Sequence, residues 1–419
     1  MLKKLLSDSL WYFVATALRA AGPFLLLPIL TRYVGTAEFG LYAMFQVLVW
    51  LAIPLAGLNT HSAVLRQHVD RDDGQFSAYV GSCFAIFAAS CVVLMLAAAV
   101  LAPQVESVTG FPTSLWCFYP LVAMSQYVIS VRLAIWQMEQ RPRTYGALAV
   151  TQTLGYLILA VLLVTVWGTG WQGIVYAQTA VYGVLAIASF ASLLRSGHLA
   201  WQLDKRHVRS ALAYSLPLVP YSLLTWVLTA ADRVMLKSYG GLEATGLYAA
   251  GYQIGVAVMV LQMAANQAWV PWFFRQLKAD TPSAKRDVIR MTYGYFVALL
   301  LVAGVVWLLA GWIVVTFLGE QFAPAVSVVP WIALSCVFNG FYVNFGNYFF
   351  YLRRTGVLAG VMALAALGNI LLNYLLIPSF GIRGAAMASA AAYLIAFVVL
   401  FAPLKRAISM PWRAALTDK

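Results

Sequence analysis

The amino-acid sequence predicts an all-α integral membrane protein built from two equivalent halves. Of its 419 residues, 63% are apolar and only 10% are charged, whereas soluble proteins are nearer half apolar and a quarter charged. Twelve apolar runs are long enough to cross a hydrocarbon core of about 30 Å as helices. They lie near 9–33, 38–65, 75–102, 113–138, 144–167, 171–194, 211–236, 243–274, 288–318, 323–351, 355–377 and 383–404.

The two halves are indicated by a stretch that occurs twice. Tyr33, Gly35, Gly40, Leu41, Tyr42 and Ala43 return 206 positions later as Tyr239, Gly241, Gly246, Leu247, Tyr248 and Ala249, and Thr60–His61 aligns with Asn266–Gln267. A second block, Gly170, Gly173 and Tyr182, returns 211 positions later as Gly381, Gly384 and Tyr393. A repeat of this length in a membrane chain marks two structurally equivalent halves. We therefore expect six-helix bundles over 1–200 and 201–419.

The basic residues predict the orientation of the chain. Of 27 Lys and Arg residues, 21 fall in the segments on the side of the N-terminus. Cytoplasmic loops carry the excess of these residues, and twelve spans place both termini on one side, so both termini are expected in the cytoplasm. Topology therefore explains the net charge of +13 without a nucleic-acid partner. The first run follows Lys3 and Lys4 but is too long for a signal peptide and is taken as a span.

The connections between spans are short, and several spans contain proline. No outer connection is long enough to fold alone, which weighs against an integral-membrane glycosyltransferase or ligase with a catalytic outer loop. Pro23 and Pro28 in the first span and Pro54 in the second predict kinks, because proline removes a helical hydrogen bond. Each kink is either a static packing feature or a moving hinge. The four cysteines lie in spans without metal-type spacing, so no metal site is expected.

Charged residues inside the predicted spans are the first candidate site residues. Arg19 lies about 15 Å deep in the first span, where an arginine facing lipid costs at least about 2.5 kcal/mol. Asp232, the only carboxylate placed inside a span, is followed by Arg233, and since helix neighbours point apart these two side chains need separate partners. Arg132 lies two turns before Glu139. These arginines either bind an anionic ligand or form structural ion pairs, and those near an interface can instead extend to water.

Amides and aromatic rings form a second candidate set. Asn339 and Asn347 share a face of the tenth span among many aromatic residues, and His61 and Asn266 occupy the repeated polar positions. Amides beside rings suit a polyhydroxylated ligand such as a sugar. Against this, amides often link one span to another, and aromatic belts are normal at membrane interfaces.

The opening of the chain resembles bacterial O-antigen and polysaccharide flippases of the Wzx type. The resemblance rests on Leu10–Trp11–Tyr12, on the run from Leu25 to Tyr33, and on Gly35, Glu38 and Gly40–Leu41–Tyr42, with Ala231–Asp232–Arg233 and Tyr239–Gly240–Gly241 later in the chain. This family shares a superfamily with multidrug and toxin extrusion (MATE) transporters and lipid II flippases. The resemblance implies a MATE-like fold with two six-helix bundles around a central cavity that opens alternately to each side of the bacterial inner membrane.

The same resemblance implies a function. The expected substrate is an oligosaccharide on polyprenyl diphosphate, an O-antigen or exopolysaccharide repeat unit moved from the cytoplasmic to the periplasmic leaflet, with cavity arginines, Arg19 first, binding the diphosphate. Expected partners are this lipid, membrane lipids and the polysaccharide polymerase and chain-length machinery, with the protein itself a monomer. No cofactor is expected, and a coupling ion, H⁺ or Na⁺, stays open. The alternative is an ion-coupled small-molecule or drug exporter on the same fold; the first span has no acid for coupling, which leaves Asp232.

Overall fold

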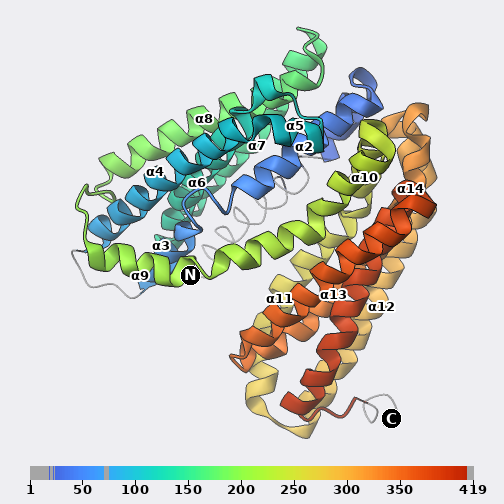
Figure 1. The fold of residues 1–419 in the computed structure, drawn as a ribbon. Helices are drawn as coiled ribbons and strands as arrows, with labels where there is room; N and C mark the ends of the chain where they lie inside the picture. The colour runs from blue at the N-terminus through green and yellow to red at the C-terminus, as the bar shows by residue number, and fades with distance from the viewer. Residues whose placement is uncertain (1–17, 19–21, 23, 70–74, 413–419) are drawn as a thin grey trace. The chain divides into compact units, whose positions relative to one another are not determined.

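The computed structural model describes residues 18, 22, 24–69 and 75–412, and all regular structure in that part of the chain is helical (Figure 1). The chain forms two compact units, Met1–Trp226 and Val227–Lys419. We call them unit 1 and unit 2 and describe each by itself. The predicted halves, 1–200 and 201–419, stay a prediction about the repeat.

Unit 1 consists of apolar helices that pack around α6 and α8. Its elements are the helix Phe24–Tyr33, α2 (Thr36–Ala52), α3 (Thr60–Val69), α4 (Phe76–Val100), α5 (Ala102–Thr109), the 3₁₀ turn η1 (Thr113–Leu115), α6 (Phe118–Met138), α7 (Pro142–Thr165), α8 (Gly170–Arg195), α9 (Lys205–Ser215) and the start of α10 (Leu218–Gly255). Helix α6 packs against α2, α3 and α8, and α8 packs against α7. These contacts bury the apolar faces of helices that are far apart in sequence.

The second predicted span, 38–65, is not one continuous helix. Helix α2 ends at Ala52, and α3 begins only at Thr60. Pro54 lies in the intervening turn, where Gly57 has a φ of 77° and Asn59 a φ of 58°, a left-handed conformation that ends a helix. The backbone N–H of Gly57 donates to Ser90 Oγ at 2.7 Å, so α4 satisfies a donor that the break leaves unpaired.

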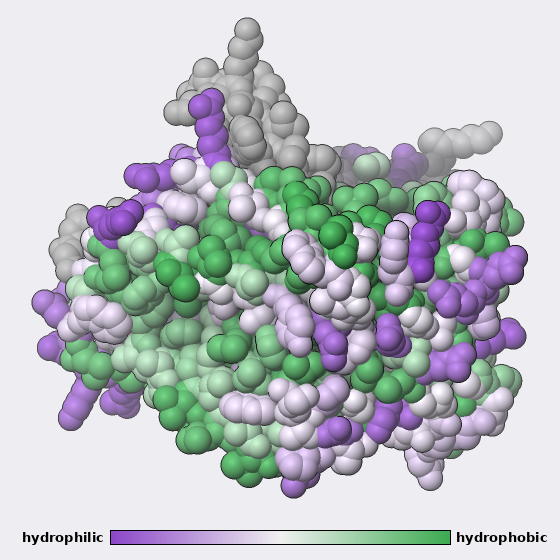
Figure 2. Space-filling model, turned by 90° about the horizontal axis from the view of Figure 1, so that it is seen from above, coloured by the Kyte–Doolittle hydropathy of each residue, from purple (hydrophilic) through white to green (hydrophobic). Residues whose placement is uncertain are grey.

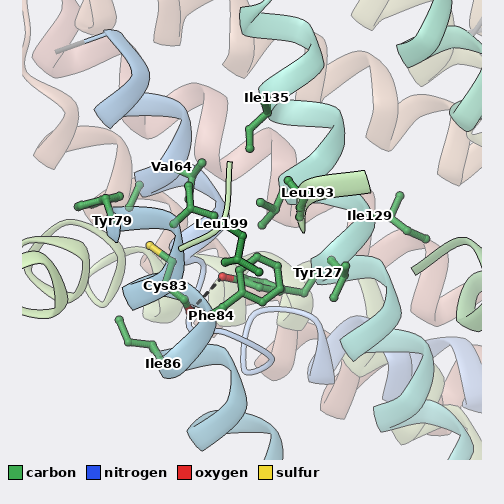
Figure 3. Close-up of a cluster of buried hydrophobic side chains, with 14 of the residues drawn as sticks. Val64, Tyr79, Cys83, Phe84, Ile86, Tyr127, Ile129, Ile135, Leu193 and Leu199 are labelled. Carbon is green, nitrogen blue, oxygen red and sulfur yellow. Dashed lines mark hydrogen bonds between the residues drawn. The ribbon is translucent and has the colours of Figure 1, made fainter. Parts of the chain in front are cut away.

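The core of unit 1 is a cluster of apolar side chains between α3, α4, α6 and α8 (Figure 3). Tyr127 lies at its centre and stacks on Phe87 with ring centroids 4.3 Å apart. Its hydroxyl is hydrogen-bonded to Thr60 Oγ1 at 2.7 Å and lies within donor distance, 3.4 Å, of the carbonyl oxygen of Cys83. This tyrosine therefore joins the broken second span to α4 and α6.

Unit 2 repeats the pattern of helices interrupted by glycine. It contains the rest of α10, α11 (Ala257–Ala279), α12 (Pro282–Ile313), the π-helical turn η2 (Val314–Leu318), the 3₁₀ segment η3 (Glu320–Ser327), α13 (Val329–Tyr351) and α14 (Thr355–Ala407). Helix α10 breaks at Gly241 and α14 breaks at Gly381, which has a φ of 55°. Its repeat partner Gly170 has a φ of 58° and opens α8. The Gly170–Gly381 pair thus keeps glycine where φ is positive, whereas Gly35, the repeat partner of Gly241, has a φ of −68°.

In the described part of the two units, seven helical stretches are long and apolar enough to cross a membrane, or eight if the bent pair η3–α13 is one span. Two of the seven stretches are interrupted: Lys205–Ala279 contains 75 residues in α9, α10 and α11, and Gly356–Ala407 contains 52 residues of α14. At 1.5 Å per residue they hold about 110 Å and 80 Å of helix in total. Each is therefore long enough for more than one crossing and is broken at a glycine, which is consistent with the predicted twelve spans. Large apolar side chains such as Leu308, 81% exposed, lie on the surface, and Figure 2 shows broad hydrophobic areas on one face.

Candidate functional site

A buried cluster of charged and hydroxyl groups lies inside unit 2. The Asp232 carboxylate accepts hydrogen bonds from the Tyr248 hydroxyl, from the backbone N–H of Arg233 at 2.8 Å, and from Ser389 Oγ at 3.4 Å. Tyr248 comes from α10 beyond the Gly241 break, and Ser389 comes from α14 beyond the Gly381 break. The carboxylate therefore joins three helical segments that the two breaks bring together.

Arg233 has hydrogen-bond and ring contacts of its own, as its place next to Asp232 in the helix predicted, but it shares Tyr248 with Asp232. Its Nη1 donates to the carbonyl of Thr229 at 2.6 Å, and its guanidinium lies 4.5 Å from the ring centroid of Tyr252 and 5.8 Å from that of Tyr248. A guanidinium over aromatic faces gains about 0.5–2 kcal/mol per ring contact, more when it is desolvated. Both Asp232 and Arg233 are buried within unit 2. When it is ionised, Asp232 accepts from all three donors and offsets the charge of Arg233.

A layer of amides forms a second polar feature of unit 2. Asn347 Nδ2 of α13 donates to Asn266 Oδ1 of α11 at 2.9 Å, so two of the predicted site residues meet. Asn344 is buried nearby on α13, and its Oδ1 has no hydrogen-bond partner among the described residues. Asn339, two turns from Asn347, is half-buried. The amides thus link α11 to α13 and leave polar capacity unused.

Unit 1 carries a neutral polar cluster at the repeat-equivalent positions. Tyr42 Oη lies 3.0 Å from Tyr156 Oη, and Gln46 Nε2 of α2 donates to Gln178 Oε1 of α8 at 2.6 Å. By the 206-residue displacement Tyr42 matches Tyr248 and Gln46 matches Tyr252, and by the 211-residue displacement Gln178 matches Ser389. Equivalent helices of the two repeats therefore meet through polar side chains, with charge in unit 2 and without it here.

The repeated polar pair also lies at equivalent contacts. Thr60 bonds to Tyr127 of α6 in unit 1, whereas its repeat partner Asn266 bonds to Asn347 of α13 in unit 2. His61 is half-buried, and its ring is edge-on to Tyr127 with centroids 6.3 Å apart. His61 thus belongs to the tyrosine-centred core of unit 1.

Arg132 belongs to a network at the end of α6 that faces the α8–α9 connection. Its Nη1 donates to Ser196 Oγ at 3.3 Å and lies 3.5 Å from His198 Nδ1, and its guanidinium covers Trp136 at 4.4 Å. His198 Nε2 in turn lies 2.8 Å from Glu139 Oε1. Partial burial, followed by the nearby Arg132, lowers the pKa of His198, although Glu139 acts in the opposite direction. Because Nδ1 faces a donor, the neutral ring with its proton on Nε2 fits this geometry.

Some predicted site residues and some observed polar clusters do not coincide. Arg19, the first candidate for diphosphate binding, lies outside the described residues. The sequence analysis did not include the neutral cluster of Tyr42, Gln46 and Gln178, because the repeat displacements lead to it only once the structure shows that Tyr248 and Ser389 contact Asp232. Nor does the spacing of Arg132 indicate its histidine partner, which is 66 residues away.

The fold and these buried clusters define a multi-pass α-helical membrane protein with the architecture of known transporters. A lipid II flippase, MurJ, superposes with a TM-score of 0.78 at 13% identity, covering 98% of this chain and 89% of that one. A multidrug resistance MATE transporter in an inward-facing conformation gives 0.76 at 14% identity, covering 93% and 95%. The predicted MATE-like fold is thereby confirmed.

Sequence comparison identifies the family. The profile described as "Polysaccharide biosynthesis protein" matches residues 5–277, and the chain belongs to this family. A protein named for the Lsg locus of Haemophilus influenzae is 22% identical over 378 residues, which cover 87% of this chain and 89% of that protein. An uncharacterized membrane protein of the same organism is 23% identical over 402 residues, covering 91% and 94%. The resemblance to polysaccharide flippases is confirmed at the level of the family.

Proposed function

We propose that the protein is a flippase that moves a polyprenyl-diphosphate-linked oligosaccharide from the cytoplasmic to the periplasmic leaflet of a bacterial inner membrane. The observation that carries this proposal is the family match over residues 5–277 in a chain with a flippase-like fold. Among its fold neighbours, MurJ is a flippase of lipid II. In this proposal both termini lie in the cytoplasm. The halves 1–200 and 201–419 move relative to each other, so that the central cavity opens alternately to each side of the membrane.

Charge supports a role for the first span in binding the diphosphate. Moving a diphosphate through hydrocarbon without compensating charge is prohibitive. Within unit 2 the charges of Asp232 and Arg233 offset each other, and Arg132 lies near Glu139, so Arg19 is the arginine we assign to the substrate. Arg233, which is enclosed by its ring and carbonyl contacts, then stabilises the conformation of α10 and does not contact the glycan. The amide layer at Asn266 and Asn347 is our candidate for the sugar hydroxyls.

A transport measurement tests this function. Protein in liposomes receives a fluorescent polyprenyl-diphosphate glycan, and translocation is followed as loss of protection from an external quencher. Wild-type protein should move the glycolipid, and Arg19→Ala should lower the rate at least tenfold. Arg143→Ala removes an exposed arginine outside the predicted spans and serves as the matched control, with an unchanged rate. Full activity of Arg19→Ala would refute the assignment of Arg19.

The rival function is ion-coupled export of small molecules, and the buried Asp232 carboxylate is the observation in its favour. The fold neighbours include transporters named for multidrug resistance. The discriminating experiment is binding to protein in nanodiscs, with polyprenyl-diphosphate glycan, polyprenyl diphosphate and a cationic drug as probes. Preference for the glycolipid supports the flippase, whereas drug binding without that preference supports export.

A further inference from the structure

Helix α9 packs on unit 1 through one stripe of residues, and a second stripe, whose Leu212 also touches the edge of the unit 1 core, lines a groove. The helix begins after Asp204, whose Oδ1 accepts from the backbone N–H of Arg206 at 2.7 Å, and it lies across α3 and α4 (Figure 1). His207, Ala211 and Tyr214 are spaced as one helical stripe. Lys205, Arg209, Leu212 and Leu216 form a second stripe, turned by about 200° from the first at 100° per residue.

The first stripe makes the contacts that attach α9 to unit 1. His207 Nε2 lies 3.2 Å from Gln75 Oε1, and its ring is 5.6 Å from that of Tyr79. The guanidinium carbon of Arg66 lies 5.0 Å from the centroid of the Tyr214 ring, and Ala211 is fully buried. These contacts fix the rotation of α9 about its axis and therefore determine where the second stripe lies.

The second stripe lines an apolar groove with two cations on its rim. A cavity of about 750 Å³ is bounded by Leu203, Lys205, Val208, Arg209, Leu212, Ala213, Leu216, Pro217 and Pro220. Lys205 and Arg209 are one helical turn apart and exposed, and neither pairs with an acidic side chain among the described residues. Two positively charged side chains therefore lie at the edge of a groove lined by aliphatic side chains.

The residues around the groove are apolar and exposed, although they lie outside the predicted spans or at the start of one. Trp201 and Leu203 are each 70% exposed and Leu216 is 50% exposed. A short helix with cations on one side, flanked by exposed tryptophan and leucine, is the pattern of a segment lying in the membrane interface. There the apolar side chains meet acyl chains and the cations meet headgroups.

We propose that the α9 groove binds an anionic glycerophospholipid of the adjacent leaflet, with the headgroup phosphate on Lys205 and Arg209 and an acyl chain along Leu212, Leu216 and the two prolines. Charge complementarity selects this occupant: a zwitterionic lipid offers the same acyl chain but no net charge to the cation pair. Each Lys or Arg near an anionic lipid surface contributes about 1 kcal/mol, which makes the pair equivalent to about a thirtyfold preference. In this proposal the bound phospholipid is not the transported substrate.

The test is a lipid titration of purified full-length protein in detergent, read by native mass spectrometry. The probes are dioleoyl phosphatidylglycerol and dioleoyl phosphatidylcholine. Wild-type protein should prefer phosphatidylglycerol, and the double variant Lys205→Gln, Arg209→Gln should lose about thirtyfold in affinity for it. Arg353→Gln with Arg354→Gln removes two exposed adjacent cations that line no described groove, and this control should bind as wild type does.

Further measurements distinguish a phospholipid headgroup from free phosphate as the ligand and test the apolar residues that line the groove. Leu216→Ser should weaken both phospholipids about fivefold, as expected for losing part of one leucine contact. Equal binding of the two phospholipids, or no effect of the double variant, would overturn the proposal. So would displacement of the lipid by millimolar inorganic phosphate, which would indicate a free-anion site. Tighter competition by polyprenyl diphosphate than by phosphatidylglycerol would assign the groove to the carrier lipid and overturn it as well.

Discussion

Replacing Asp232 with asparagine tests whether the buried cluster of unit 2 is held together by charge. The substitution keeps the shape of the side chain and removes its negative charge. An asparagine can accept at one end only, so it cannot serve Tyr248, Ser389 and the backbone N–H of Arg233 as the carboxylate does. The guanidinium of Arg233 also loses its nearby compensating charge.

The size of the effect follows from these contacts. A hydrogen bond to a charged group contributes about 1.5–3 kcal/mol, and breaking a buried ion pair costs about 3–5 kcal/mol. Arg233 keeps its carbonyl and ring contacts, so we expect Asp232→Asn to lower the free energy of unfolding by about 2–4 kcal/mol. Tyr248→Phe removes one charge-assisted bond and should cost about 1.5–3 kcal/mol. Ser389→Ala removes the long 3.4 Å contact and should cost less than about 1 kcal/mol.

Equilibrium unfolding in mixed detergent micelles, followed by tryptophan fluorescence, measures these differences. The double variant Asp232→Asn, Tyr248→Phe should cost less than the sum of the single changes, because the two groups share one bond. If Asp232→Asn stays within about 0.5 kcal/mol of wild type, the range of ordinary surface changes, the cluster does not hold the α10 and α14 segments together and the reasoning fails.

Three other changes test the rest of the structure. The pKa of His198 is lowered by burial, so the unfolded chain binds its proton more readily and stability should fall as pH decreases from about 6.5 toward the folded-state pKa; thermal unfolding of His198→Gln should lack this part of the pH dependence. Gly384→Ala should destabilise by about 1–3 kcal/mol in chemical unfolding, since a Cβ would collide with the carbonyl of Leu376. Asn347→Leu should cost about 1 kcal/mol by loss of its interhelical bond to Asn266.

Matched measurements keep these outcomes interpretable. Gly360, also in α14, has open space where a Cβ would lie, so Gly360→Ala should be neutral or slightly stabilising by helix propensity. If it is as damaging as Gly384→Ala, close packing at Gly384 is not the cause. Acidic residues also titrate at low pH, so the evidence on His198 is the difference between wild type and variant; parallel pH profiles would contradict the prediction.

The sequence was most informative about features that composition and local spacing determine. The apolar runs predicted helices, and the breaks at Gly241 and Gly381 fall in the gaps between predicted spans, after 236 and after 377. Adjacency in a helix predicted separate partners for Asp232 and Arg233. The prediction of one continuous second span was wrong at residues 53–59, where the kink predicted at Pro54 is a full break, because proline and three residues with left-handed φ act together in the turn after α2.

The partners of each polar side chain depend on packing between distant segments and could not be predicted locally. Ser389 is 157 residues from Asp232, and Gln178 is 132 residues from Gln46. Helical periodicity gives the face of a residue but not the helix that meets that face. For Arg132 the decisive partner, His198, lies in an irregular connection that has no periodicity at all.

The repeat retains positions more faithfully than it retains chemistry. Tyr42 and Tyr248 are the same residue at equivalent places, yet one faces a neutral tyrosine and the other a carboxylate. Because interhelical bonds between neutral groups in membranes average only about 0.6 kcal/mol, while a buried carboxylate must be compensated or expelled, equivalent helix contacts are held with different strength in the two units. Two identical halves would respond identically to any ion. Among the described residues, only unit 2 has a carboxylate at this contact, so only unit 2 offers an acidic group there for a cation to bind. Ion coupling of one half would require this asymmetry.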